Sequence, residues 1–237
     1  MPKRGMILES LSLVQACLNW NKTDGGKGIM IDSIIFDMDG TLWDSTQEVA
    51  VAFNKVLQEN YPEVTDEVTA ERLKGLFGLP LEVIGVRLFQ SVTEEKAIKL
   101  IAECCEYENE YLAEHGAPLY EGLEEALKIL SEKYKLFIVS NCQEGYVQCF
   151  FQANPHLEKY FTDYEYPGRS GKLKADNIKM VVERNGLKQP IYVGDTAGDA
   201  NAAKEAGVPF VFARYGFGEV ENYDDVIDSL QELVDKY

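Results

Sequence analysis

Short apolar runs recur along the chain, and each of them is followed by polar residues. The four runs are Ser33–Phe36, Leu136–Val139, Ile191–Val193 and Val208–Phe212. Three segments with apolar residues at helical spacing alternate with them, namely Leu123–Tyr134, Asp176–Asn185 and Ala197–Ala206. Short β-rich runs that alternate with helices predict right-handed crossovers and a parallel sheet. The pattern therefore predicts an α/β fold with a Rossmann-like core.

The segment between the first two strands has a different pattern. From Ser45 to about His115 the chain has no strand-like run, and its apolar residues recur at helical spacing. This texture predicts an all-helical insert at residues 46–115. The core is then formed by residues 31–45 and 116–237.

Polar residues mark the expected ends of several helices. Ser45, with Glu48 three residues later, predicts a capping box at the first helix of the insert, and Thr93 predicts the cap of a later helix. The last segment, Tyr223–Tyr237, is expected to form a closing amphipathic helix.

The first thirty residues are interpreted separately from the core. A basic start and the partly apolar stretch Ile7–Leu18 faintly resemble a secretory leader, but Glu9 interrupts that stretch, which argues against export. Asn21–Gly28 is polar and rich in glycine, as linkers are. We interpret residues 1–30 as an extension, either a peripheral helix or a non-native tag.

Charge and apolar content restrict the partners. The 40 acidic and 23 basic residues give a net charge of −17, which disfavours nucleic acids and anionic membrane surfaces. No apolar stretch approaches the roughly 20 residues that span a bilayer. A phosphorylated ligand is repelled as well unless a divalent cation, lysines or backbone N–H groups reverse the local field. The pattern carries no signal for a particular oligomeric state.

The cysteines indicate the compartment. The chain has five of them, Cys17, Cys104, Cys105, Cys142 and Cys149, without a CxxC spacing. The odd number and the spacing argue against a disulfide framework and a zinc site, and a reducing cytoplasm is the expected location. Cys104 and Cys105 fall on the apolar side of a predicted helix and are expected to be packing residues.

Polar side chains follow the predicted strands directly. Asp37 and Asp39 come after the first strand, and Ser140 and Asp195 come after two others. Because the carboxyl ends of parallel strands meet at one edge of a sheet, we expect these side chains to converge there. Mg²⁺ prefers oxygen ligands, so a carboxylate, a backbone carbonyl, a further aspartate and a phosphate oxygen would suit it.

Four motifs in this order resemble those of the haloacid dehalogenase superfamily, over about residues 31 to 218. They are Asp37-Met38-Asp39-Gly40-Thr41, Ser140-Asn141, a lysine near the helix that starts around Asp176, and Gly194-Asp195-Thr196-Ala197-Gly198-Asp199. The resemblance implies the fold of that superfamily, a Rossmann-like core with an inserted helical cap domain.

The resemblance also implies roles for individual residues. Asp37 attacks phosphorus to form an aspartyl phosphate, and Asp39 protonates the leaving oxygen and later activates water. Mg²⁺ is held by Asp37, by the backbone carbonyl of Asp39 and by Asp195, with Asp199 supporting the site. Substrate binding falls to Thr41, Ser140 and Asn141, of which Ser140 holds the phosphoryl group.

Two lysines compete for the third motif. Lys174 resembles a variant of the family in which lysine directly precedes the helix, whereas Lys172 fits the commoner spacing but lacks the proline that usually follows. We favour Lys174 as the catalytic lysine that neutralises the phosphoryl group. Lys172 is then expected to be a solvated surface charge.

The motifs also discriminate among the activities of the superfamily. Hydrolytic dehalogenases lack the second aspartate and phosphonatases replace it with alanine, so Asp39 favours phosphate ester chemistry. The helical insert resembles the cap of phosphoglycolate phosphatases and β-phosphoglucomutases, which closes over small substrates. The segment Lys74–Pro80 resembles the specificity loop of such caps, with Arg87 as an anion contact or, equally, as an exposed arginine beside an ordinary turn.

We therefore predict a Mg²⁺-dependent phosphatase of a small phosphorylated metabolite. A phosphosugar mutase is the alternative enzyme, because it shares Asp37 and Asp39. A phosphate-accepting signalling module and a catalytically idle binding protein are the alternatives of another class. The helical insert and the acid/base role of Asp39 argue against the first, and the complete set of motifs argues against the second.

Overall fold

The computed structural model describes residues 30–237. Of the extension predicted at residues 1–30, residues 1–29, which include Cys17, lie outside the described residues. The six strands of the sheet are β1 (Ser33–Phe36), β2 (Lys135–Val139), β3 (Phe161–Glu165), β4 (Pro190–Gly194), β5 (Phe210–Ala213) and β6 (Asp225–Ile227). Their order in the sheet is β3-β2-β1-β4-β5-β6 and all pairs are parallel. The predicted α/β fold with a parallel sheet is confirmed.

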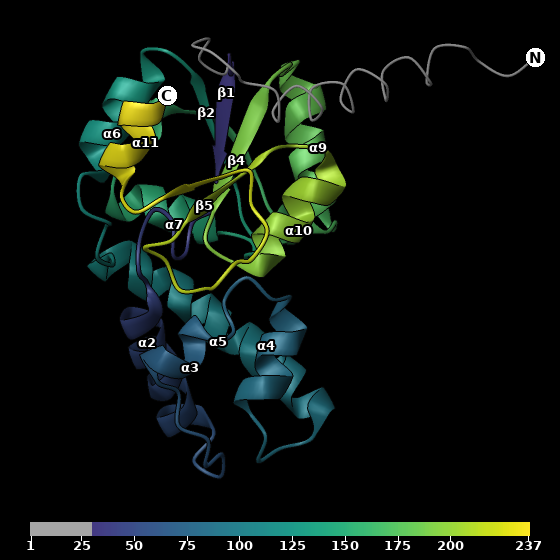
Figure 1. The fold of residues 1–237 in the computed structure, drawn as a ribbon. Helices are drawn as coiled ribbons and strands as arrows, with labels where there is room; N and C mark the ends of the chain where they lie inside the picture. Colours follow the sequence, from purple (N-terminus) through teal and green to yellow (C-terminus); the bar gives the residue numbers. More distant parts are fainter. Residues whose placement is uncertain (1–29) are drawn as a thin grey trace, which may run out of the picture.

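Helices cover both faces of the sheet (Figure 1). They are α6 (Leu123–Ser131), α7 (Tyr146–Ala153), α8 (Pro167–Ser170), α9 (Lys174–Asn185), α10 (Ala197–Ala206) and α11 (Leu230–Lys236), with a 3₁₀ turn at Glu158–Tyr160. Alternate strand residues face opposite sides. Ile34 and Phe36 pack into the core with α6, α7 and α11, whereas Ile35 packs into a second core with α9 and α10.

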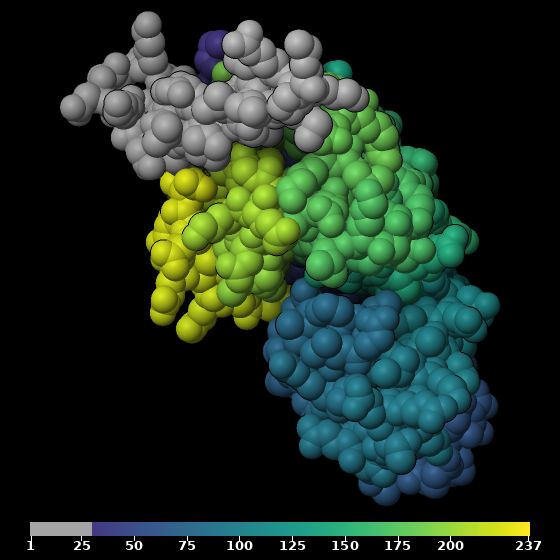
Figure 2. All heavy atoms as spheres, turned by 90° about the vertical axis from the view of Figure 1, so that its right-hand side faces the viewer, coloured from purple at the N-terminus to yellow at the C-terminus, as the bar shows by residue number. Residues whose placement is uncertain are grey.

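Between β1 and β2 the chain forms five helices. Four of them lie where the all-helical segment is predicted. They are α2 (Thr46–Asn60), α3 (Ala70–Lys74), α4 (Leu81–Leu88) and α5 (Glu94–His115). They lie together beyond one end of the sheet and project from the rest of the molecule (Figures 1 and 2). Thr93 caps α5 as expected, since its side chain accepts from the Lys96 N–H.

Ser45 is not the cap that its spacing predicts. No hydrogen bond joins its side chain to the start of α2, and its hydroxyl donates to Asp39 instead, at 2.6 Å. The capping box is therefore wrong, because the backbone of Ser45 is already helical (φ −86°, ψ −2°) and the Thr46 N–H donates to Oδ1 of Asp44.

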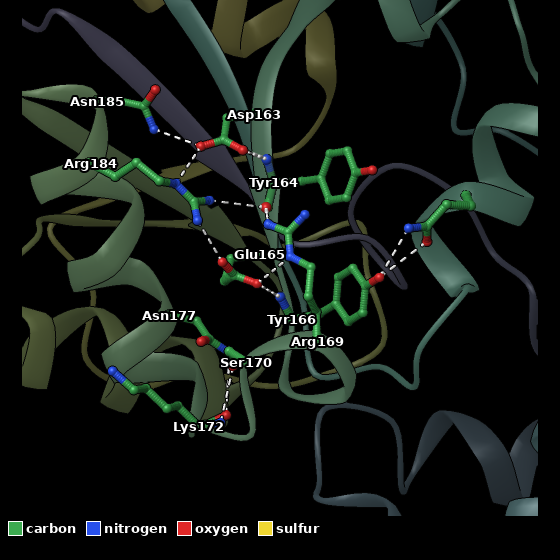
Figure 3. Close-up of polar contacts among 11 residues, drawn as sticks. Asp163, Tyr164, Glu165, Tyr166, Arg169, Ser170, Lys172, Asn177, Arg184 and Asn185 are labelled. Carbon is green, nitrogen blue, oxygen red and sulfur yellow. Dashed lines mark hydrogen bonds and ion pairs between the residues drawn. The ribbon is translucent and has the colours of Figure 1, made fainter.

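Both outer strands of the sheet lie where no strand is expected. β3 carries polar residues because it is an edge strand, and ion pairs cover its outer side (Figure 3). Arg184 of α9 pairs with Asp163 and Glu165, each at 2.8 Å, and Arg169 pairs with Glu165 at 2.8 Å. Such pairs protect an open strand edge from further strand pairing.

The other outer strand corrects the predicted closing helix. Tyr223–Tyr237 is not one helix, because β6 occupies Asp225–Ile227 and α11 begins only at Leu230. Ser229 caps α11, since its hydroxyl accepts from the Glu232 N–H. The Ser-x-x-Glu spacing at this point is the signal that marks the true start of the helix.

The buried cysteines have the packing role that the sequence predicts for Cys104 and Cys105. Cys104, Cys105, Cys142 and Cys149 are free and buried, and the first two lie in the main core as expected. Among residues 30–237, no helix is both long enough and apolar enough to cross a membrane.

Candidate active site

The chain that leaves β1 forms a tight turn at the carboxyl end of the sheet. The Asp37 N–H donates to the Val193 carbonyl of β4 at 2.9 Å, which continues the sheet by one residue. The turn then passes through Gly40, whose φ is +82°. A Cβ at that position would lie 2.1 Å from Oδ2 of Asp195. Both the positive φ and this close contact therefore require glycine. The missing side chain lets the Asp195 carboxylate approach the turn.

Three aspartates form a buried cluster at this edge. Carboxylate oxygens of Asp37, Asp195 and Asp199 all lie within 4.8 Å of one another, and the three side chains are 3%, 0% and 0% exposed. Burial, reinforced by the charge of Asp199, raises the pKa of Asp37 to about 7. Burial and the two neighbouring carboxylates also raise the pKa of Asp195. The cluster therefore needs positive charge to stay ionised.

Lys174 supplies part of that charge from the first turn of α9. Its Nζ lies 2.6 Å from Oδ1 of Asp199 and 3.0 Å from Oδ1 of Asp37, and the side chain is 4% exposed. Burial acts to lower the pKa of Lys174, but the charges of Asp199 and Asp37 raise it well above its usual value. The pKa of Asp199, which burial would raise, is held low by Lys174.

The competing lysine lies outside the cluster. Lys172 is exposed, and its backbone N–H donates to Oγ of Ser170 (Figure 3). Because α9 begins at Lys174 rather than near Asp176, the first helical turn aims Lys174 at the sheet edge. The geometry places Lys174, and not Lys172, beside Asp37.

One oxygen of the cluster is incompletely satisfied. Oδ1 of Asp37 is buried without a hydrogen bond of good geometry, although Nζ of Lys174 lies 3.0 Å away as an ion pair. A buried, unsatisfied carboxylate oxygen beside two further carboxylates fits a hard cation with oxygen ligands, such as Mg²⁺. Asp37 and Asp195 are the residues that would hold it most directly, since Asp199 is occupied by Lys174 and by the Thr196 hydroxyl.

Asp39 points away from this cluster and is held separately. Its Oδ1 accepts hydrogen bonds from the hydroxyls of Ser45 and Tyr146, both at 2.6 Å. These two hydroxyl oxygens are 2.9 Å apart. Burial raises the pKa of Asp39, while the two hydroxyls oppose the shift. Two donors on one oxygen fix the orientation of the carboxyl group.

The Tyr146 hydroxyl is expected to matter for turnover through this contact. Tyr146→Phe removes one of the two donors, so kcat for alkyl phosphates should fall by about 10-fold, the scale of a hydrogen bond to a charged group. An aryl phosphate, whose leaving oxygen needs little protonation, should be affected much less. Steady-state kinetics with both esters measures the difference, with the exposed Tyr223→Phe as the control. An equal loss for both esters would contradict the positioning of Asp39.

The predicted phosphate-binding residues lie in two places. Ser140 and Asn141, which follow β2, line a cavity together with Asp37 and Asp39. Thr41 is fully buried, and its hydroxyl faces Oδ1 of Asp195 at a distance of 3.5 Å. Thr41 is not among the residues that line this cavity. Its role in substrate binding stays a prediction.

The predicted specificity loop contacts the core at the same edge. The Gly78 carbonyl accepts a hydrogen bond from Nδ2 of Asn141 at 2.8 Å. Lys74 forms an ion pair with Asp44 at 2.9 Å, and the rings of Phe77 and Phe217 pack edge to face. The insert thus closes over the cavity, whose volume is about 30 Å³. Arg87 is exposed and is not among its lining residues.

Three residues of this site escape prediction from the sequence. Tyr146 stands in the first turn of α7, and Glu108 of α5 and Gln143 line the same cavity. Tyr146 and Glu108 sit on faces that otherwise contribute to the core, so helical spacing marks them as packing positions. Only the position of Gln143, shortly after the Ser140-Asn141 motif, gives a signal.

Comparisons with known proteins agree with this geometry. The sequence model of the haloacid dehalogenase-like hydrolase family matches residues 34–213. A phosphoglycolate phosphatase of Vibrio parahaemolyticus is 30% identical over 222 residues, which cover 86% of this chain and 95% of that protein. The phosphoglycolate phosphatase of Escherichia coli K12 is 27% identical over 230 residues, with 85% and 86% covered.

Solved structures share the fold. A haloacid dehalogenase-like hydrolase from Streptococcus pneumoniae aligns with a TM-score of 0.72 and 25% identity, over 86% of this chain and 97% of that one. CbbY from Rhodobacter sphaeroides, solved in complex with phosphate, aligns with a TM-score of 0.69 and 19% identity, over 86% and 96%. The chain therefore belongs to the haloacid dehalogenase-like hydrolase family and is a phosphatase of the subgroup in which its phosphoglycolate phosphatase relatives fall.

Proposed function

We propose that this phosphatase is Mg²⁺-dependent and hydrolyses a small phosphate monoester through a phosphorylated Asp37. The observation that carries the proposal is the cavity that Asp37 and Asp39 line together, with Lys174 directly behind Asp37. Asp37 as the nucleophile, Asp39 as the acid/base group and Lys174 as a fixed positive charge would together meet the requirements of phosphoryl transfer.

The cation is part of the proposal because residues 30–237 place too little positive charge at the cluster. Lys174 offers one charge against the three buried carboxylates of Asp37, Asp195 and Asp199, and a phosphate dianion adds to the deficit. Mg²⁺, when bound by Asp37, Asp195 and the backbone carbonyl of Asp39, supplies the charge that lets a phosphate dianion approach a carboxylate.

The first step follows from the positions of the two aspartates. An oxygen of Asp37 forms a bond to phosphorus while the bond from phosphorus to the ester oxygen breaks. The departing oxygen receives the proton of Asp39, whose carboxyl group Ser45 and Tyr146 hold in place. Lys174 stabilises the charge on the transferring group, together with the Ser140 hydroxyl at the cavity wall.

The second step reverses the role of Asp39. Its carboxylate removes a proton from water, the water oxygen bonds to phosphorus, and the bond between phosphorus and Asp37 breaks. Inorganic phosphate leaves and Asp37 is regenerated. The cavity of about 30 Å³ has room for about one or two waters, which supports transfer to water.

Removal of divalent cations tests the metal requirement. Chelator should reduce turnover to below about 1% and added Mg²⁺ should restore it, because Lys174 alone does not offset three buried carboxylates. Mg²⁺ should also raise the melting temperature of the chain in the absence of substrate, since binding stabilises the folded state. Steady-state kinetics and thermal unfolding measure the two effects.

Asp195→Asn is the matched variant for this test. It keeps the shape of the side chain but removes a ligand charge, so it should require a higher Mg²⁺ concentration for half-maximal activity. Full activity of the wild type in chelator would contradict the proposed metal requirement.

A further inference from the structure

The cavity above Asp37 has one apolar wall and one polar wall. The apolar wall comes from the insert and includes Phe53, Ile84 and Ile101. The polar wall includes Glu108 of α5 and Gln143. Because the cavity also reaches Asp39, which faces the departing oxygen in the proposed reaction, these walls surround the leaving group of the substrate. This step rests on the proposed function.

No lysine or arginine lines this cavity in the part of the chain that the structure describes. Lys174 lies just behind Asp37, but its ammonium group is already shared between Asp37 and Asp199. Arg87, the arginine that the sequence suggests as an anion contact, is exposed outside the cavity. The cavity therefore offers no cation to a second negative charge on the substrate.

Glu108 contributes an ionisable carboxyl group to the polar wall of the cavity. It is 4% exposed, and its Oε2 accepts a hydrogen bond from Nε2 of Gln143 at 3.1 Å. Burial and the nearby charge of Asp39 raise the pKa of Glu108 to about 8, so the carboxyl group is largely ionised only above that pH. A buried carboxyl group in either form is a good partner for a hydroxyl group, and its ionised form repels a carboxylate.

The polar wall is fixed rather than adaptable. Nε2 of Gln143 also lies 3.1 Å from Oδ1 of Asn109, and Nδ2 of Asn109 donates to the Glu144 carbonyl at 2.8 Å. These bonds tie α5 to the loop that follows β2, next to the Ser140-Asn141 motif. A wall held in this way can select between leaving groups of similar size, because its polar atoms cannot turn away.

We propose that Glu108 selects a compact phosphate monoester whose leaving group carries a hydroxyl group and no negative charge. A hydroxyl on the second carbon of the leaving group can hydrogen-bond to the polar wall. A carboxylate there meets Glu108 and Asp39 without a counter-charge. Phosphoglycolate, which carries such a carboxylate, is therefore a poor substrate of this chain, even though relatives are named for it.

Three esters of nearly equal size test this selection with Mg²⁺ present at about pH 9, where Glu108 is ionised: 2-hydroxyethyl phosphate, ethyl phosphate and phosphoglycolate. The wild type should show the highest kcat/KM for 2-hydroxyethyl phosphate. Ethyl phosphate should be about 10-fold poorer, because it leaves the polar wall without a partner. Phosphoglycolate should be at least about 10-fold poorer, because like charges face each other.

Glu108→Gln separates the two causes. The amide keeps the hydrogen bond to a hydroxyl group but removes the negative charge, so the preference over ethyl phosphate should persist while phosphoglycolate improves to within about 3-fold of 2-hydroxyethyl phosphate. The matched control is Glu106→Gln, which changes an exposed glutamate of the same helix. This control should leave all three ratios unchanged.

The outcomes are distinct. A wild type that prefers phosphoglycolate would overturn the inference and leave the proposed phosphatase intact. Ratios that Glu108→Gln does not change would overturn the assignment to Glu108. If none of the three esters releases phosphate and a generic aryl phosphate is also inert, the proposed function itself fails.

Discussion

Asp37→Asn is expected to lower turnover by at least about 10,000-fold, the scale at which removal of a covalent nucleophile acts in other hydrolases. An amide oxygen is a poor nucleophile towards phosphorus, so no phosphorylated enzyme can form. The change keeps the shape of the side chain and an oxygen near Nζ of Lys174, which lies 3.0 Å from Oδ1 of Asp37. Phosphate release from 2-hydroxyethyl phosphate measures the effect.

The fold should survive this change. The Asp37→Asn substitution removes one of three crowded carboxylates, so the melting temperature without metal should stay the same or rise. Residual turnover within about 100-fold of the wild type would contradict a nucleophilic role for Asp37.

Lys174→Ala is expected to lower kcat by at least about 100-fold, as the loss of one preorganised charge in a transition state does elsewhere. The variant also leaves Asp37 and Asp199 buried without the ammonium group that now lies 3.0 Å and 2.6 Å from them. Kinetics should therefore be measured at saturating Mg²⁺, with circular dichroism to verify that the variant is folded.

Lys172→Ala is the matched control, since Lys172 is two residues away and exposed. It should change kcat by less than about 2-fold, as surface substitutions usually do. Lys174→Arg keeps the charge but not the shape, and is expected to recover only part of the activity. A large loss in Lys172→Ala with normal turnover in Lys174→Ala would assign the role to the other lysine.

The central strands could be predicted because both of their faces are buried. Ser33–Phe36 matches β1 in full, and the residues that follow it reach the edge where parallel strands end. The outer strands could not be predicted in the same way. β3 and β6 have Asp163 and Asp225 within them, and each is stabilised by pairing with one neighbour and by ion pairs rather than by an apolar pattern.

Some residues of the candidate site could also be predicted from the sequence, and others could not. Asp37, Asp195 and Lys174 are local to strand ends and helix starts, where short motifs are informative. Glu108 and Tyr146 reach the cavity from helices whose packing depends on contacts between the insert and the core. Their helical spacing is that of core residues, so only the three-dimensional arrangement distinguishes them.

The central claim is that phosphate passes through Asp37, and Asp39→Asn gives the most direct test. Asparagine cannot activate water, so an aryl phosphate should still phosphorylate Asp37 while hydrolysis slows. Rapid quenching followed by peptide mass spectrometry should find one phosphate on Asp37 in Asp39→Asn, a smaller amount in the wild type, and none in Asp37→Asn. Added sugar phosphate should not accept that phosphate in preference to water, as it would in a mutase. Phosphate on any other residue, or turnover without a covalent intermediate, would contradict the account.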